Sequence, residues 1–299
     1  MKIKATPGER VFQACNYVFL TLLAFVCLYP MWHVLMASFS DSDALIAHSG
    51  LLLLPVELSP DAYKRVLSNH LVWIGYWNTL KLLVLGVSWQ MVMTTLGAYV
   101  LSRREFMLRR PIMLAITFTM FFSGGTIPTY LNIRNLHLLN SWWVLILTCG
   151  VGSYNLILAR TFFSSSISPE LEEAAIIDGA SNFRIFTTIV LPLSKSVLGV
   201  LVLYCVVGQW NGYTAALVYL NNSQEKWPLA LFLRNILSKA EQLSNDAFSV
   251  STEQYLRNLH LANLLKYAVI IVSTVPLMIL YPIMQKFFEK GLMVGSVKG

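Results

Sequence analysis

Residues 168–179 read SPELEEAAIIDG and predict a short helix with a defined beginning and a defined end. Ser168 is a preferred N-cap residue, and Pro169 suits the first helical position because its nitrogen needs no hydrogen-bond partner there. The carboxylates of the first turn face the positive end of the helix dipole. Gly179 is then expected to end the helix, because glycine takes a positive φ at little cost.

A second helix is predicted directly after this turn. Ser181 can cap it, and Phe183, Phe186 and Val190 share one face by their i, i+3, i+7 spacing. Pro192 ends this helix or bends it into the next apolar run. The stretch therefore predicts a helical hairpin, for which an amphipathic hairpin at a membrane interface is the simplest interpretation. A DNA-binding helix-turn-helix fits poorly, since basic residues are nearly absent from it.

Long apolar runs lie on both sides of the hairpin. The chain has 299 residues, 56% of them hydrophobic and 12% charged, with a mean hydropathy of +0.60. This composition excludes disordered, collagen-like and secreted disulfide-rich chains, and it disfavours a soluble enzyme. A bilayer core about 30 Å thick needs roughly 20 helical residues. The chain is therefore predicted to be an all-α, polytopic membrane protein with six transmembrane helices, approximately Tyr17–Ser38, Thr79–Leu101, Pro111–Tyr130, Ser141–Ala159, Ser196–Tyr219 and Leu264–Gln285.

The basic residues predict how these helices are oriented. Thirteen Lys and Arg residues lie on the side that holds both termini and seven on the other, apart from Lys81 and Lys266 at span starts. The positive-inside rule therefore predicts cytoplasmic N- and C-termini. We expect a cytoplasmic tail over residues 1–16, a transmembrane domain over 17–285 and a cytoplasmic tail over 286–299. Within the domain, 39–78 and 220–263 are expected to be external loops, and 160–195 a cytoplasmic coupling segment.

The hairpin also carries a motif. Glu173-Ala174-Ala175, Gly179, Ile189 and Leu191-Pro192 match the pattern E-A-A-x3-G-x9-I-x-L-P at all seven defined positions. Here the chain resembles the permease subunits of ABC importers, and we call residues 168–192 the EAA segment. In that family the first helix of the segment is the coupling helix, which lies in a groove on a separate ATPase subunit. The resemblance implies a role in ATPase coupling for Glu172, Glu173, Ala174, Ala175, Asp178, Gly179, Ile189, Leu191 and Pro192.

The resemblance extends over nearly the whole chain. The spans, the stretch Ile177–Ser181 and the ending GLMVGSVKG (291–299) are similar to carbohydrate permeases of the maltose-permease kind, most of all to LplC/YtcP-type polysaccharide and oligosaccharide permeases. This implies a type I ABC importer permease for oligosaccharides in the bacterial cytoplasmic membrane. The implied partners are a second homologous permease in a heterodimer, two ATPase subunits and an extracellular solute-binding lipoprotein.

The chain itself is not expected to hydrolyse ATP. It contains no Gly-Lys dipeptide, so the Walker A phosphate loop is absent from the sequence. ATP and Mg are therefore expected on the partner ATPases, with no cofactor in this chain. Its histidines and four cysteines show no metal-ligand spacing, and its basic residues are dispersed between apolar runs. We accordingly expect no metal and no nucleic-acid partner.

A sugar path needs amide, hydroxyl and aromatic groups inside the bundle, because buried polar groups must find partners. The candidates for this path are Tyr204, Gln209, Trp210, Asn211 and Tyr213 in the fifth span, with Asn155 in the fourth and Gln90 in the second. An aromatic belt combined with polar helix–helix contacts explains the fifth-span residues equally well. Interhelical packing is favoured for Asn155 and Gln90.

The long external loop is expected to contact the binding protein, as in the permeases that the chain resembles. Trp227, Phe232 and Asn235 are the candidates, and packing on the loop's own span ends is the alternative.

Two other functions are alternatives to transport. A membrane-embedded enzyme would need paired ionisable groups at depth, which the spans lack. The other alternative is a membrane sensor or scaffold that binds a soluble partner through the hairpin. A transport assay with the ATPase present distinguishes this function from that of a permease.

Overall fold

The computed structural model describes residues 7–245 and 265–282. The described residues are mostly helical and form no strand; one isolated β-bridge pairs Ser40 with Leu58. The predicted all-α class is therefore confirmed. Several predicted parts lie outside the described residues: the first residues of the N-terminal tail (1–6), loop residues 246–263, the end of the last span (283–285) and the C-terminal tail with its GLMVGSVKG ending.

The chain forms two compact units, and the first contains residues 1–69 and 235–274. Its helices are α1 (Pro7–Ser38), α2 (Ser42–Ala47) and α3 (Asp61–Leu67). Helix α1 begins ahead of the predicted start at Tyr17 and exposes nearly all of its apolar side chains. Its last turn is joined to α3 by a 2.7 Å hydrogen bond between the hydroxyls of Ser38 and Tyr63. The exposed apolar surface of α1 is that of a helix surrounded by lipid or by other apolar helices.

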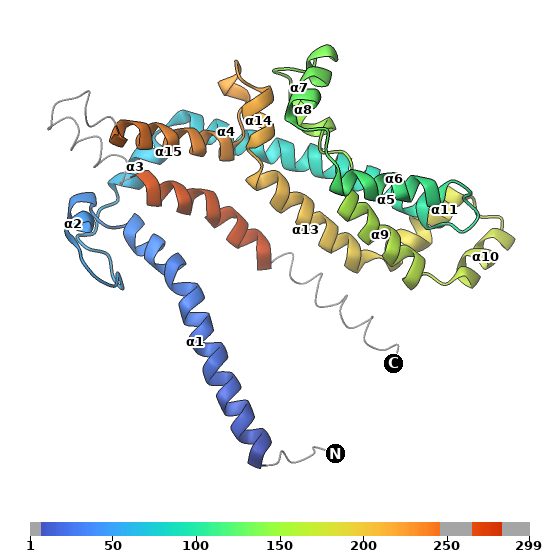
Figure 1. Ribbon diagram of the computed structural model, residues 1–299, viewed down its shortest axis with the longest axis horizontal. Coiled ribbons are helices and arrows are strands. Elements are labelled where there is room, and N and C mark those ends of the chain that lie inside the picture. Colours follow the sequence, from blue (N-terminus) through green and yellow to red (C-terminus); the bar gives the residue numbers. More distant parts are fainter. Residues whose placement is uncertain (1–6, 246–264, 283–299) are drawn as a thin grey trace. The chain divides into compact units, whose positions relative to one another are not determined.

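The second unit, residues 70–234 with 275–299, contains the remaining predicted spans up to the fifth. One long helix runs over His70–Ser102 and consists of α4 (His70–Leu82), the π-helical turn η1 (Leu83–Val87) and α5 (Ser88–Ser102). Helices α6 (Arg109–Phe121), α9 (Ser153–Ser166) and α13 (Lys195–Asn211) lie alongside α5 (Figure 1). The other helices are α7 (Thr126–Asn135), α8 (Trp142–Leu147), α10 (Pro169–Ile177), α11 (Asn182–Ile185), η2 (Phe186–Val190), α12 (Leu191–Leu193), α14 (Thr214–Tyr219), η3 (Gln224–Lys226) and α15 (Leu229–Asn245).

Three predicted spans are broken rather than continuous. The third bends by 115° between α6 and α7, where Gly125 has a φ of +87°. The fourth, predicted as Ser141–Ala159, consists of α8 and α9 separated by residues 148–152, and α9 continues to Ser166. The fifth ends as a helix at Asn211 and resumes as the short α14. Each break contains glycine, which is a poor helix former. The helix therefore ends at these residues although the apolar run continues beyond them.

Length and composition identify which helices can cross a membrane. Three helices qualify alone: Pro7–Ser38, His70–Ser102 and Leu265–Pro282. Two bent pairs qualify as broken spans, α6 with α7 and Asn182–Leu193 with α13. The remaining predicted span corresponds to α8 and α9. Up to five of the six predicted spans thus have helices that are long and apolar enough to cross a membrane within the described residues, whereas α8 and α9 do not meet that test, and most bounds differ from those predicted.

Within the described part of the second unit, buried apolar residues form two clusters. The EAA-side cluster joins α5, α9, α11, η2 and α13, and contains Ala98, Tyr99, Ala159, Phe163, Ile167, Ile185, Phe186, Val190, Val197 and Leu201. The loop-side cluster joins α4, α7, α8, α14 and α15, and contains Leu82, Ile133, Val144, Leu145, Ile146, Ala216, Tyr219, Leu220 and Leu231. The first of these clusters supports the EAA segment.

Candidate functional site

The first helix of the EAA segment forms as predicted, with one difference at its start. Helix α10 begins at Pro169 and ends at Ile177. Ser168 has the extended backbone of an N-cap, but its hydroxyl donates to the Glu170 carboxylate instead of accepting a backbone N–H. At the other end Gly179 has a φ of +77°, and its N–H donates to the Ile176 carbonyl at 2.9 Å. The predicted glycine stop is confirmed.

The second helix of the segment differs from the prediction in the face that it buries. Ser181 caps α11, accepting a hydrogen bond from the Arg184 N–H at 3.3 Å. Phe186 and Val190 are buried as expected, but Phe183 is 70% exposed. The expected apolar face was therefore wrong at Phe183, which lies in the first turn of α11, because the buried face is formed by Ile185 together with Phe186 and Val190.

The chain then turns into the fifth span. The axes of Asn182–Leu193 and Lys195–Asn211 differ by 84°. Pro192 lies in the first turn of α12, and the break falls two residues later at the buried Ser194. The bend expected near Pro192 is confirmed, with α12 placed between that proline and the span.

One side of the EAA segment is packed into the protein. Ala175, Ile189 and Leu191 are half-buried against the EAA-side cluster, as is Ala180 just after the turn. These contacts involve residues from α5, α9 and α13. The small and apolar positions of the motif therefore attach the hairpin to the bundle.

The other side of the segment is exposed. Glu173, Ala174, Ile176, Ile177 and Asp178 are all exposed, and the Ile177 side chain reaches 86% exposure. Phe183, in the helix after the turn, is also exposed, at 70%, and exposed large apolar side chains of this kind are typical of docking sites. We call these five exposed residues of α10 and its C-cap (Glu173, Ala174, Ile176, Ile177 and Asp178), together with Phe183, the docking face.

A polar contact that the sequence did not indicate joins α10 to the end of α5. Arg103 forms an ion pair with Glu172, and the two side chains are 14% and 21% exposed. Arg103 also donates to the Tyr99 hydroxyl and stacks over its ring, with 4.3 Å from the guanidinium carbon to the ring centroid. The i, i+4 spacing of Tyr99 and Arg103 was visible in the sequence, but nothing local pairs Arg103 with Glu172.

Two of the predicted path residues contact cysteines on neighbouring segments. The Gln209 carbonyl oxygen accepts a hydrogen bond from the Cys149 thiol at 3.2 Å. Its amide nitrogen lies against Gly86 of η1, where a Cβ would be 2.6 Å away. The Asn155 amide donates to Cys205 at 3.7 Å. Gln209 and Asn155 thus lie among polar contacts between helices, which matches the interhelical alternative for Asn155.

The other path candidates do not form one cluster with these. Trp210 is only 7% exposed, and its ring lies 6.4 Å from that of Tyr76 between centroids. Tyr204 is exposed beside Tyr154, with 6.2 Å between ring centroids. Among the remaining candidates, Gln90 is half-buried, and Asn211 and Tyr213 are exposed.

The candidates in the long loop pack closely on their own chain. The Trp227 indole donates to the Leu220 carbonyl at 2.9 Å, and Phe232 is buried. Asn78 of α4 donates to the carbonyls of Glu225 and Trp227 at 2.7 and 3.0 Å. Asn235 is half-buried on α15. Packing on the span ends therefore accounts for Trp227 and Phe232.

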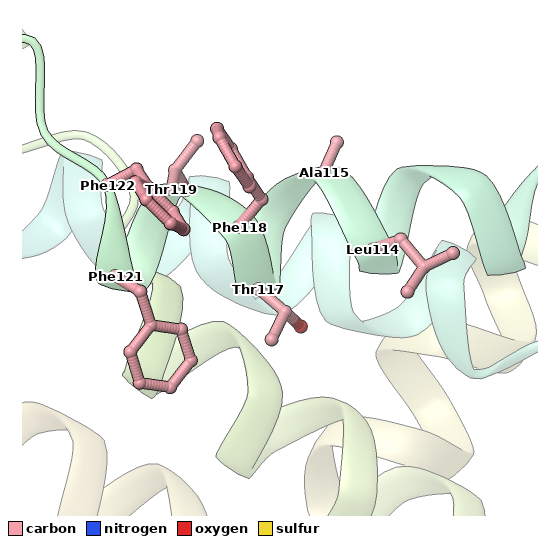
Figure 2. Close-up of a pocket in the computed structure, with 7 residues that line it drawn as sticks. All are labelled: Leu114, Ala115, Thr117, Phe118, Thr119, Phe121 and Phe122. Atoms are coloured by element: carbon pink, nitrogen blue, oxygen red, sulfur yellow. The ribbon is translucent and has the colours of Figure 1, made fainter.

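A shallow hollow runs along α6 and carries no polar recognition groups beyond hydroxyls. Figure 2 shows its lining, which is Leu114, Ala115, Thr117, Phe118, Thr119, Phe121 and Phe122. The labelled side chains point to different sides of a single helix. Such a surface suits lipid chains or an apolar helix rather than a sugar.

Comparison with known proteins gives the family. The profile of "Binding-protein-dependent transport system inner membrane component" matches residues 95–294, a range that includes Tyr99, Arg103 and the whole EAA segment. The chain belongs to this family. It is accordingly an ABC transporter permease, a multi-pass protein of the cytoplasmic membrane, and members of the family are transport components.

Relatives match this permease over almost its full length. It is 38% identical over 296 residues to the polygalacturonan/rhamnogalacturonan transport system permease protein YtcP of Bacillus subtilis, covering 97% of this chain and 99% of that one. It is 37% identical over 298 residues to Protein LplC of the same organism, covering 98% and 97%. A solved bacterial ABC transporter involved in the import of the acidic polysaccharide alginate matches with 33% identity and a TM-score of 0.81, covering 96% and 100%. The resemblance to carbohydrate permeases is confirmed.

Proposed function

We propose that this chain is the permease subunit of an ATP-driven importer that takes up oligosaccharides delivered by an extracellular solute-binding protein. Both termini lie in the cytoplasm, and the working complex contains a second homologous permease and two ATPase subunits that bind ATP and Mg. The observation that carries this proposal is the two-sided EAA segment, which is packed on the bundle on one side and exposes Ile177 on the other.

The docking face has the chemistry needed to bind an ATPase groove. Ile177 and Phe183 offer apolar surface that is removed from water on docking, which is the main driving term for association. The small side chain of Ala174 lets the α10 backbone approach a partner closely, and the exposed Glu173 can pair with a basic residue of the groove. Asp178 lies beside them at the C-cap.

The packed residues then pass movement of α10 into the spans. Ala175 attaches α10 to the EAA-side cluster, and Ile189 and Leu191 attach the helix that follows. The turn at Gly179 fixes the angle between the two helices, and Pro192 lies at the start of the turn into α13. A displacement of α10 by the ATPase is therefore transmitted to α13 through a packed connection.

The cargo we propose is an oligosaccharide derived from a polysaccharide. The relatives are named for polygalacturonan/rhamnogalacturonan transport and for import of the acidic polysaccharide alginate. In this chain the path runs along α13 and the turn after it, where Tyr204, Asn211 and Tyr213 present exposed hydroxyl, amide and aromatic groups. Gln209, Trp210 and Asn155 contact neighbouring segments around this path, and the half-buried Gln90 completes the set of candidates.

The binding protein is proposed to dock on the external loop. Contacts with Asn78 and Thr79 hold the first part of this loop in place, the latter through the Leu229 N–H at 2.9 Å. A fixed platform is suited to a soluble partner, because little loop entropy is lost on binding. Phe232 is buried and the Trp227 indole donates to the Leu220 carbonyl, so these two residues support the platform from within, while the half-buried Asn235 is the candidate that can reach the binding protein.

The function is tested by uptake in reconstituted vesicles that contain both permeases and the ATPase. With binding protein outside and ATP inside, labelled acidic oligosaccharides should accumulate, and omission of either the binding protein or ATP should stop accumulation. Neutral oligosaccharides of equal length serve as the comparison for cargo class. If no oligosaccharide accumulates while the ATPase still assembles on the chain, the sensor or scaffold interpretation is favoured instead.

A further inference from the structure

We propose that Arg103 is a positioning residue that locks the coupling helix α10 to the end of α5, so that movement of α10 reaches the second span directly. The inference rests on the proposed coupling role of α10. In chain order, α10 is joined to α9 on one side and through α11 to α13 on the other. No loop joins α10 directly to α5, because α6 to α9 lie between them in the chain. A direct path from α10 to that span therefore depends on side-chain contacts.

Arg103 makes this connection with two groups at once. One terminal nitrogen, Nη1, pairs with Glu172 of α10, and the other, Nη2, donates to the hydroxyl of Tyr99 on α5. The guanidinium is planar and presents several donors in a fixed arrangement, which lets it hold both partners in one geometry. Both charged side chains are mostly removed from water, at 14% and 21% exposure, so their attraction is weakly screened.

Tyr99 extends the connection to the second helix of the hairpin. Its hydroxyl donates to the carbonyl of Asn182, the first residue of α11, at 3.1 Å. Its ring lies 5.0 Å from that of Phe186 between centroids, inside the EAA-side cluster. The end of α5 therefore contacts α10 through Arg103 and the following helix through Tyr99.

The last turn of α5 is also fixed, so it can transmit displacement without fraying. The final carbonyls of a helix have no partner within it. Here the Leu101 carbonyl accepts from Arg160 of α9 at 3.3 Å, and the Arg103 carbonyl accepts from Arg109 at 3.5 Å. At its other end α5 continues into η1, where Gly86 lies against Gln209 of α13. Movement received at Arg103 thus reaches a contact between the second and fifth spans.

The test compares neighbouring residues of the same type in the assembled, reconstituted importer. Arg103→Gln and Glu172→Gln remove the pair one side at a time, and the double variant removes both charges. Arg104→Gln is the matched control for arginine, since Arg104 is exposed. Glu173→Gln is the matched comparison for glutamate, because Glu173 belongs to the docking face. Uptake, ATP hydrolysis and copurification of the ATPase are measured for each.

We expect each single variant of the pair to retain the ATPase subunits while oligosaccharide uptake per ATP hydrolysed falls about ten-fold, because one partner is left as an unpaired, mostly buried charge. The double variant should be no worse than either single variant, since the two residues act as one unit. Arg104→Gln should behave as the unmodified protein. Glu173→Gln should instead weaken copurification of the ATPase, which identifies a fault in docking rather than in transmission.

Three results overturn the inference. The first is an uptake per ATP that is unchanged in Glu172→Gln, and the second is a double variant whose losses multiply. The third is loss of the ATPase in Glu172→Gln, which would place Glu172 in the groove. Tyr99→Phe keeps the ring and removes only the hydroxyl, so it supplies the same test with little risk to folding. If the uptake per ATP hydrolysed is unchanged in Tyr99→Phe, this counts against the proposed route, even if the Arg103→Gln protein does not reach normal abundance in the membrane.

Discussion

Replacing Gly179 with valine should abolish most ATP-driven uptake while leaving the protein in the membrane. Gly179 has a φ of +77°, a conformation that β-branched residues rarely adopt. No atom lies within 4 Å of the position where a Cβ would be, so the effect arises from backbone strain alone. A strain of roughly 1–3 kcal/mol shifts the balance between two arrangements of the turn by about 5- to 150-fold.

The strain is expected to change the direction of α10 relative to the helix that follows. The turn is closed by hydrogen bonds from the Gly179 and Ala180 N–H groups to the carbonyls of Ile176 and Ala175, each at 2.9 Å. A turn that relaxes from positive φ loses these bonds and turns the docking face away. Uptake and ATP hydrolysis in reconstituted vesicles measure the outcome, and membrane abundance controls for folding.

Gly179→Asn is the matched control for this prediction. Asparagine tolerates the left-handed region better than other residues, and open space surrounds the position, so most uptake should be retained. Normal uptake by the valine variant at normal abundance is the result that contradicts a role for this turn in coupling.

Trp210→Ala should be the most destabilising single change in the fifth span. Trp210 is 7% exposed and packs near Tyr76 of α4, so truncation leaves a cavity between the second and fifth spans. Such truncations of a large aromatic residue cost roughly 3–5 kcal/mol. Uptake should fall together with the melting temperature of the purified protein. Trp210→Phe retains most of the volume and should restore both.

Asn211→Ala separates packing from sugar contact at the adjacent position. Asn211 is exposed at the end of α13, so its truncation should leave the melting temperature unchanged. A group that hydrogen-bonds the sugar loses roughly 1–3 kcal/mol when its partner is left unpaired, and uptake should fall accordingly. Full uptake by Asn211→Ala would assign the sugar contacts to the partner permease.

The parts of the fold that were predicted well depend on local chemistry. Pro169 and Gly179 mark the bounds of α10 through properties of their own backbones, and these bounds are confirmed. The apolar runs likewise identified membrane helices because composition alone determines what partitions into a bilayer. The motif of the EAA segment could likewise be recognised from the sequence, because it requires no knowledge of contacts between residues that are far apart in the chain.

The parts that were missed depend on packing between distant segments. The break in the fourth span at residues 148–152 contains Gly150 and Gly152, but the hydropathy of the run, from which the span was predicted, does not reveal it. The spacing of Phe183, Phe186 and Val190 predicts a buried Phe183, but the packing of α11 buries Ile185 instead. The pairing of Arg103 with Glu172 requires α5 and α10 to meet, which neither local sequence specifies.

The central claim is that α10 docks on an ATPase subunit, and crosslinking from the docking face measures this most directly. Ile177, at 86% exposure, would be replaced by a photoreactive benzophenone amino acid in the complete importer. Ile127 of α7, at 75% exposure and on the predicted external side, is the matched control position. The account predicts a crosslink to the ATPase from position 177 and none from position 127. An importer that transports its cargo but forms no crosslink to the ATPase from position 177 would contradict it.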